Sequence, residues 1–244
     1  MRKALKNTIL ILLLLTLSVS TAFLAYLHFF ASDDHDLSGE WTAELDMTQQ
    51  ASVTALAWLQ DIEAVSISLE EMESYMQGLT IRINLTMEQT HRFGGTFSGS
   101  VLPESYDACR KAAYEAFAAA FQALLTERLC MAGYTGSTDR EAIEALTAET
   151  FGMSTVSYLM SCGPALLPPL EELQAGYDGS GTYEAGEGIL TRQFDAGTPA
   201  AVRAERYIRK ESVLILSEET DSAADGDFFD QNPIIYTLIQ PSTQ

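Results

Sequence analysis

Residues 38 to 48 read SGEWTAELDMT, and this stretch decides the class of fold. Apolar side chains occupy every second position and alternate with Glu, Thr and Asp; they are Trp41, Ala43, Leu45 and Met47. Successive side chains of a β-strand point to opposite faces, so a period of two predicts a strand with one buried face. The alternation returns at residues 79 to 88, where Leu, Ile and Met alternate with Thr, Arg, Asn and Glu. We therefore expect an antiparallel sheet.

Short strands continue through the C-terminal part of the chain. Residues 95 to 101 are expected to pair with residues 79 to 88 in a hairpin that has Gly94 and Gly95 near its loop. Five further strands are expected at residues 181–184, 188–193, 203–209, 212–218 and 233–240. The eight strands form three groups, at about 38–48, 79–101 and 181–240. Such a series of hairpin-linked strands is typical of a small barrel, either closed or half-closed.

Two helical regions interrupt the strands. Residues 50 to 76 carry apolar side chains at spacings of three and four, which predicts an amphipathic helix that is weakest near residues 66 to 68. Residues 103 to 176 predict a helical insertion. Its parts are an alanine-rich helix at 104–131, a helix opened by the capping box Thr138 to Glu141, and short helices at 154–161 and 168–175. The predicted fold is therefore α+β, a barrel interrupted by helices.

The N-terminal 31 residues form a separate unit. Thr8 to Phe30 is a run of 23 residues without a formal charge. As a helix it would be about 34 Å long, enough to cross a hydrocarbon core of about 30 Å. Basic residues precede the run and acidic residues follow it, which predicts a transmembrane signal-anchor with a cytoplasmic N-terminus and an extracytoplasmic domain at residues 32–244. The alternative is a secreted protein whose leader is cleaved near Ala22.

The charge of the chain excludes one class of partner. The chain has 14 Lys and Arg against 34 Asp and Glu, a formal charge of −20. Three of the basic residues, Arg2, Lys3 and Lys6, precede the apolar run, which leaves 11 basic residues against 34 acidic residues, or −23, for the rest. Nucleic acid needs a basic surface, so we expect no nucleic-acid partner, and anionic lipid surfaces are disfavoured too.

The residues offer little sign of catalysis. The three histidines, His28, His35 and His91, lack the partners that a metal site or an acid–base pair requires. Residues 221 to 232 resemble a calcium loop only in part, because Ala223 and Asn232 stand where two oxygen ligands are needed. We therefore expect no catalytic residue, no cofactor and no metal ion.

All three cysteines, Cys109, Cys130 and Cys162, fall in the helical insertion. If residues 104 to 131 form one straight helix, Cys109 and Cys130 are about 31 Å apart, far beyond the reach of a disulfide. A disulfide would therefore have to include Cys162. We expect buried free thiols.

The opening Gly39-Glu40-Trp41, together with the order of the later strands, is similar to the lipocalin-like (calycin-type) β-barrels. More narrowly, the chain resembles membrane-attached or secreted lipocalin-like proteins of anaerobic Gram-positive bacteria. The resemblance implies that Gly39 and Trp41 close one end of the barrel, with Trp41 under a basic residue of the last strand. Residues 233 to 240 contain no Lys or Arg, so that partner is either missing or supplied from elsewhere in the chain, by Arg192 or Arg209.

Four basic residues lie within eight positions, namely Arg203, Arg206, Arg209 and Lys210. They form a candidate contact site for an anionic group, and charge balance on an acidic sheet is the alternative.

Two functions fit these observations. The favoured one is a non-enzymatic, membrane-anchored extracytoplasmic module that binds an apolar small molecule or a protein partner at the cell envelope. The alternative is an envelope hydrolase with two facing carboxylates whose pKa values are driven apart. If side chains fill the space under Trp41, an adaptor role gains over ligand binding.

Overall fold

The structure is a computed structural model, and it describes residues 17, 20, 21, 36–62, 67–195, 202–218 and 231–239. The predicted membrane span at residues 8–30 and the cleavage position near Ala22 thus lie almost entirely outside the described residues, as does most of the partial calcium loop. Among the helices of the described part, none combines the length and apolar character needed to cross a bilayer.

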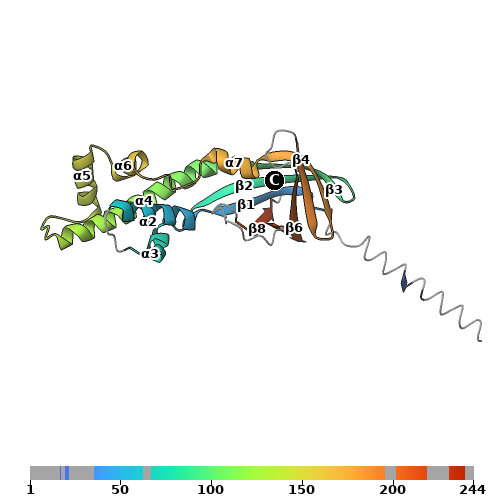
Figure 1. The fold of residues 1–244 in the computed structure, drawn as a ribbon, viewed down its shortest axis with the longest axis horizontal. Helices are drawn as coiled ribbons and strands as arrows, with labels where there is room; N and C mark the ends of the chain where they lie inside the picture. Colours follow the sequence, from blue (N-terminus) through green and yellow to red (C-terminus); the bar gives the residue numbers. More distant parts are fainter. Residues whose placement is uncertain are drawn as a thin grey trace, which may run out of the picture.

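Eight antiparallel strands form a closed barrel in the order β1 to β8, each beside its neighbour in sequence (Figure 1). The strands are β1 Gly39–Asp46, β2 Thr80–His91, β3 Gly94–Val101, β4 Gly179–Gly186, β5 Ile189–Phe194, β6 Val202–Lys210, β7 Val213–Glu218 and β8 Ile234–Leu238. The number of strands and their up-and-down order confirm the prediction, and the barrel is closed. This architecture is consistent with a lipocalin-like fold.

The apolar and polar side chains that alternate in the sequence face the inside and the outside of the barrel, respectively. Trp41 lies opposite Leu85 and Leu45 lies opposite Ile81, and all four side chains are buried. The residues between them, such as Glu44 and Arg82, face outward. Each strand therefore contributes one apolar face to a common core, which is the main source of stability for such a sheet.

The barrel closes where β1 meets β8. Only Trp41 with Leu238 and Thr42 with Thr237 pair across this seam, and the Ile239 amide donates to the Glu40 carbonyl at 2.7 Å. Gly39 begins β1 at a φ of +142°, a backbone angle that residues other than glycine rarely adopt. A Cβ at this position would lie 2.4 Å from Cδ1 of Leu238, so the seam needs a glycine for two reasons.

Helices fill two of the connections between strands. Between β1 and β2 lie α2 Thr48–Ile62 and α3 Leu69–Tyr75, and between β3 and β4 lie α4 Pro103–Met131, α5 Arg140–Phe151, α6 Thr155–Cys162 and α7 Leu170–Tyr177. The expected weak point in the first helical region becomes the start of α3, where the Ser68 hydroxyl caps the Glu71 amide. The four helices between β3 and β4 run from Pro103 to Tyr177, the region for which the sequence predicts a helical insertion.

One local prediction was wrong. The cap of α5 is Asp139, whose carboxylate accepts from the Ala142 amide at 2.9 Å, and not Thr138, because Asp139 stands directly before the first helical residue. The turn between β2 and β3 is at residues 92–93, and Gly94 and Gly95 lie next to it at the start of β3, near the loop as predicted. A Cβ on Gly95 would lie 1.9 Å from the Glu88 carbonyl, so the glycine permits close approach of two strands.

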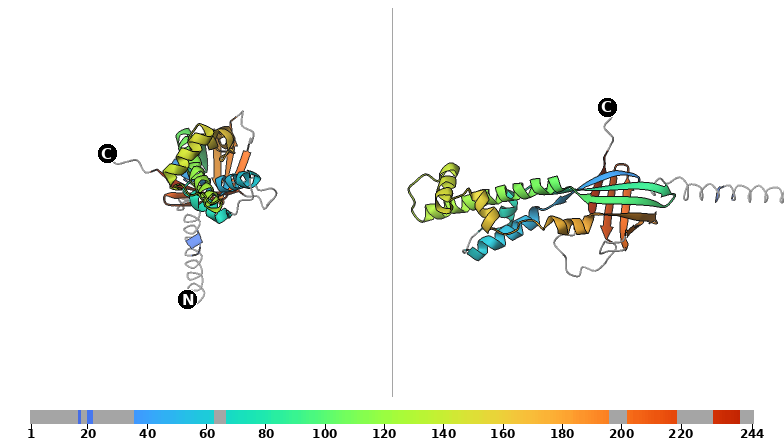
Figure 2. Two further views of the ribbon diagram at one scale, coloured as in Figure 1. Left: turned by 90° about the vertical axis from the view of Figure 1, so that its left-hand side faces the viewer. Right: turned by 90° about the horizontal axis from the view of Figure 1, so that it is seen from above.

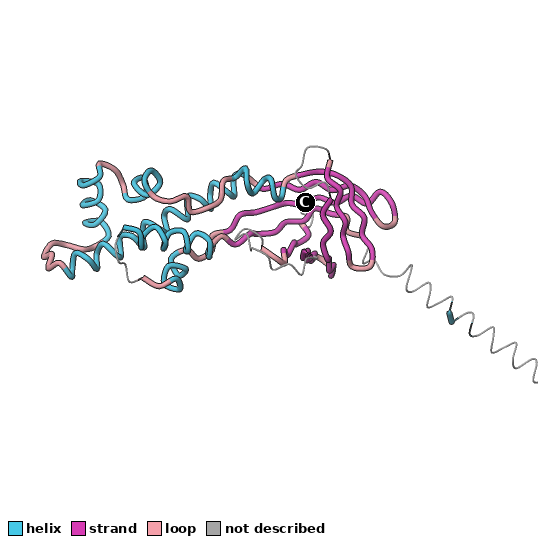
Figure 3. Tube along the Cα trace, viewed as in Figure 1, coloured by secondary structure: helices cyan, strands magenta, loops and turns pink. Residues whose placement is uncertain are grey.

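The described part of the molecule is elongated, with the barrel and the helices at opposite ends (Figure 2). Both helical connections leave the barrel at the same end, so helices and strands segregate (Figure 3). We call the other end of the barrel the base; its tight turns are at residues 92–93, 187–188 and 211–212. β1 starts at the base.

The helical region is held together by polar contacts as well as apolar packing. Trp58 of α2 packs edge-on against Phe117 of α4, with ring centroids 5.6 Å apart. The Glu144 carboxylate of α5 accepts from the Thr155 hydroxyl of α6 at 2.7 Å and from the Gln122 side chain of α4. Because Gln122 and Thr155 are buried, Glu144 satisfies donors that would otherwise destabilise the fold.

Candidate functional site

Trp41 lies inside the barrel with no exposed surface, and its Nε1 donates to the Leu37 carbonyl at 2.9 Å. Two basic residues were suggested as its partner. One of them, Arg209, lies close enough to Asp36, just before β1, for its charge to act on the Asp36 carboxylate. Burial raises the pKa of Asp36, but hydrogen bonds from Ser38 and the charge of Arg209 outweigh it, so the pKa lies below its usual value. Gly39 and Trp41 both lie in the first half of β1, near the base of the barrel, and their barrel-closing role stays a prediction.

Arg192 is engaged elsewhere, in an ion pair that lies inside the barrel. Its Nε and Nη2 donate to the two carboxylate oxygens of Glu205, each at 2.8 Å, and the two residues are 7% and 4% exposed. The rings of Phe97 and Phe194 lie 5.4 and 5.6 Å from the guanidinium carbon. This geometry is the bidentate one in which a buried guanidinium and carboxylate satisfy each other.

Two tyrosines lie with this pair in the core. Burial raises the pKa of Tyr236, and the nearby charges of Arg192 and Glu205 act on it in opposite directions. Burial also raises the pKa of Tyr183, to about 12. Both phenols are therefore neutral at ordinary pH, so the charged groups in this part of the core are the ion pair and the half-buried Arg203 of β6.

In the described part of the chain, the space at this ion pair is almost filled. The cavity bounded by Arg192, Arg203, Tyr177 and Tyr236 has a volume of about 10 Å³. That is room for at most one water molecule, whereas pockets for small organic ligands measure roughly 300–1,000 Å³. This part of the core is built from protein side chains rather than around a ligand.

The four clustered basic residues of β6 do not share one face. Arg203 and Arg209 are half-buried at inward positions, and the Arg203 Nη1 donates to the Gly176 carbonyl at 3.4 Å. Arg206 and Lys210 are exposed at outward positions. The period of two of a strand separates the pairs, so a single contact site made of all four is not what the structure shows.

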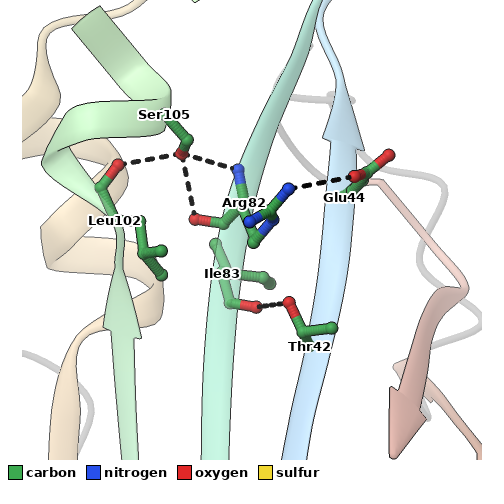
Figure 4. A network of polar contacts seen from close by, with 6 residues as sticks. All are labelled: Thr42, Glu44, Arg82, Ile83, Leu102 and Ser105. Carbon is green, nitrogen blue, oxygen red and sulfur yellow. Dashed lines mark hydrogen bonds and ion pairs between the residues drawn. The ribbon is translucent and has the colours of Figure 1, made fainter. Parts of the chain in front are cut away.

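A groove of about 450 Å³ lies where α4 begins, beside β1 and β2. Its polar wall is drawn in Figure 4: the Arg82 amide donates to the Ser105 hydroxyl at 2.9 Å, and the Arg82 guanidinium lies 3.8 Å from the Glu44 carboxylate. The Ser105 hydroxyl in turn donates to the Leu102 carbonyl at 2.9 Å. Since β2 extends beyond β3 at this point, Ser105 and Leu102 satisfy backbone groups that the sheet leaves open.

The cysteines are free thiols, as predicted, but only Cys109 is buried. It lines the groove described above, and burial, with a smaller effect of Asp46, raises its pKa to about 11. Cys130 and Cys162 are exposed, so the expectation of burial was wrong for these two. They stand near the ends of α4 and α6, where the helices leave the packed interface.

The chain matches no protein-family model, and neither the curated proteins nor the solved structures compared with it gave a significant match. The likeness to lipocalins therefore stands on the architecture of the barrel.

In the described ranges, no three His, Cys, Asp or Glu residues gather where they could hold a metal ion. His91, at the end of β2, is exposed. The feature that sequence reasoning missed is the buried pair of Arg192 and Glu205. The signal was present, because Arg192 stands between Leu190 and Phe194 in strand alternation and so had to point inward.

Proposed function

We propose that this protein is a non-enzymatic, membrane-anchored adaptor of the bacterial cell envelope, whose filled barrel is a rigid base for binding a protein partner. The observation that supports it is the barrel core. The bidentate pair of Arg192 and Glu205 lies inside the barrel, and the cavity beside it measures about 10 Å³. A partner rather than an apolar small molecule is therefore the better candidate of the two.

The predicted anchor sets the orientation of the proposed adaptor. Between the predicted span at residues 8–30 and Asp36 there are five residues, which reach at most about 18 Å when extended. β1 starts at the base of the barrel, so the base would face the membrane and the helices would point away from it. An adaptor of this form presents its helical region to the envelope space.

The test of orientation uses the exposed thiols. In intact cells a membrane-impermeant maleimide should label Cys130 and Cys162, and Cys109 should stay unlabelled because it is buried. The variant C130S/C162S is the matched control and should take up no label. Label that appears only after the cells are broken would overturn the extracytoplasmic placement. Labelled protein in the medium, shortened at its N-terminus, would support cleavage near Ala22.

The test of the filled barrel is a search for bound small molecules. Residues 33–244 are expressed alone, incubated with a lipid extract and weighed by native mass spectrometry, beside a lipocalin of known ligand as the positive control. We expect the mass of the bare polypeptide. A stoichiometric apolar adduct that disappears on Trp41→Ala substitution would reject the adaptor in favour of a ligand carrier.

No specific observation in the described residues favours the carboxylate hydrolase. A general acid needs a raised pKa, and the pKa values of Asp36 and Asp139 are both lowered.

A further inference from the structure

The outside of the barrel has two faces of different composition. We call the outward positions of β1 to β4 the acidic face and those of β5 to β8 the acid-free face. On the acidic face Arg82 is accompanied by five carboxylates, those of Glu40, Glu44, Asp46, Glu88 and Glu184. This is the composition expected of a solvated surface in a chain with 34 acidic residues.

The acid-free face has no Asp or Glu at any outward position. Those positions are 189, 191 and 193 in β5, the even residues from 202 to 210 in β6, 213, 215 and 217 in β7, and 235 and 237 in β8. Their only charged side chains are Arg206 and Lys210. In so acidic a protein, thirteen outward positions without a carboxylate set this face apart.

A row of isoleucines crosses the acid-free face. Ile208 lies opposite Ile215, which lies opposite Ile235, so the three side chains are direct neighbours on three strands. Ile208 is 63% exposed and Ile235 is 57% exposed. A shallow groove of about 390 Å³ adjoins the row; it is lined by Ile189, Ile208, Ile215 and Arg206, and at its edge by Glu187 of the turn between β4 and β5. A contiguous apolar patch of this kind marks an interaction surface.

The charges beside the row indicate what binds there. Arg206 and Lys210 stand two residues before and two residues after Ile208, on the same face, about 7 Å away along the strand. We propose that the acid-free face docks a segment of a protein partner in which carboxylates flank aliphatic side chains. The proposal deepens the adaptor function and rests on its protein partner, but it does not need the membrane anchor.

Two other occupants fit less well. A second copy would bring its own Arg206 and Lys210 against the same cations, and like charges across an interface disfavour association. An anionic bilayer would attract the two cations, yet it is wider than this face and would also meet the surrounding surface of a chain with a formal charge of −20, whereas a short segment contacts this face alone. A carboxylate-bearing segment of a protein meets the apolar row and both cations at once.

The test uses two defined peptides and the full chain in uncharged detergent micelles. One nine-residue peptide alternates Glu with Ile, and the other alternates Lys with Ile. We expect the acidic peptide to bind at least tenfold more tightly than the basic one, measured by fluorescence anisotropy. R206E/K210E should weaken its binding at least tenfold, and so should I208S/I235S. R82E, on the acidic face, and Met160→Ser, at an exposed apolar position elsewhere, should change it less than twofold.

Circular dichroism and thermal unfolding of each variant confirm that the outward substitutions leave the barrel folded. Equal affinity for the two peptides, or an equal loss in R82E, would overturn the proposal. So would a dimer in analytical ultracentrifugation that dissociates on I208S/I235S, since the occupant is then a second copy. A photo-crosslinker at position 208 that joins to lipid in nanodiscs would identify the bilayer instead. A ligand found inside the barrel would reject the adaptor function while leaving these peptide results unchanged.

Discussion

Arg192 and Glu205 form a bidentate ion pair inside the barrel, and the guanidinium lies beside the paired rings of Phe97 and Phe194. Each partner needs the other, because removal of one leaves the charge of the other buried without its bidentate partner. The residue directly opposite Glu205 is Leu190, and Arg192 stands two positions further along β5, so the ion pair connects the two strands diagonally. It therefore sets the alignment of these strands as well as filling the core.

Removal of one partner should destabilise the barrel far more than removal of both. We expect Arg192→Met or Glu205→Leu alone to lower the free energy of unfolding by about 3–5 kcal/mol. The double variant R192M/E205L should recover most of that loss, because two apolar side chains can replace a buried pair. Urea unfolding of the three variants measures the coupling. Additive losses in the double variant would show that the pair acts as two independent contacts.

Gly39 should tolerate no side chain, since its φ of +142° is strained for other residues. We expect Gly39→Ala to lower the free energy of unfolding by about 1–3 kcal/mol. Gly186→Ala is the matched control, because Gly186 is also at a strand position but a Cβ there meets nothing within 4 Å. The control should stay within about 0.5 kcal/mol of the native chain in the same denaturant series. Equal losses would mean that the seam at Leu238 does not depend on this glycine.

The fold could be predicted from the sequence because most strands have one apolar and one polar face. Trp41 to Met47 shows the alternation residue by residue, and the burial of each side chain follows it. The cap of α5 was misplaced by one position, since Thr138 and Asp139 are both good capping residues and only the backbone decides between them.

The candidate site was harder to predict because it depends on which way β6 faces. Arg203, Arg206, Arg209 and Lys210 are close in sequence, yet alternation divides them between the inside and the outside. The acid-free face could not be seen at all before closure of the barrel, since its residues come from four separate strands. Ile208 and Ile235 are 27 residues apart in the chain, and they come onto one row because each pairs with Ile215 of β7, which lies between them.

The cap of α5 should make part of the stability depend on pH. Hydrogen bonds from Ser137 and from the Ala142 amide lower the pKa of Asp139 below its usual value of 3.8. A lowered folded pKa means that the stabilisation is complete above pH values near 3.8 and is lost as the pH falls through the folded pKa. The melting temperature should therefore fall less steeply in acid for Asp139→Asn, which keeps a capping oxygen without the charge. Thr138→Ala should behave as the native chain; a loss there equal to that of Asp139→Ala would restore Thr138 as the cap.

The three thiols should differ in reactivity by their burial. Cys109 has a pKa of about 11, against an ordinary value of 9.0, so at pH 8 its thiolate fraction is about 100-fold smaller than that of an unshifted thiol. We expect Cys130 and Cys162 to react rapidly with Ellman's reagent and Cys109 to react only after unfolding. In C130S/C162S the single remaining thiol should show only the slow phase, and denaturant should make it fast. A fast phase in the folded double variant would show that the groove beside α4 opens readily enough to admit the reagent, contrary to the close packing of Cys109.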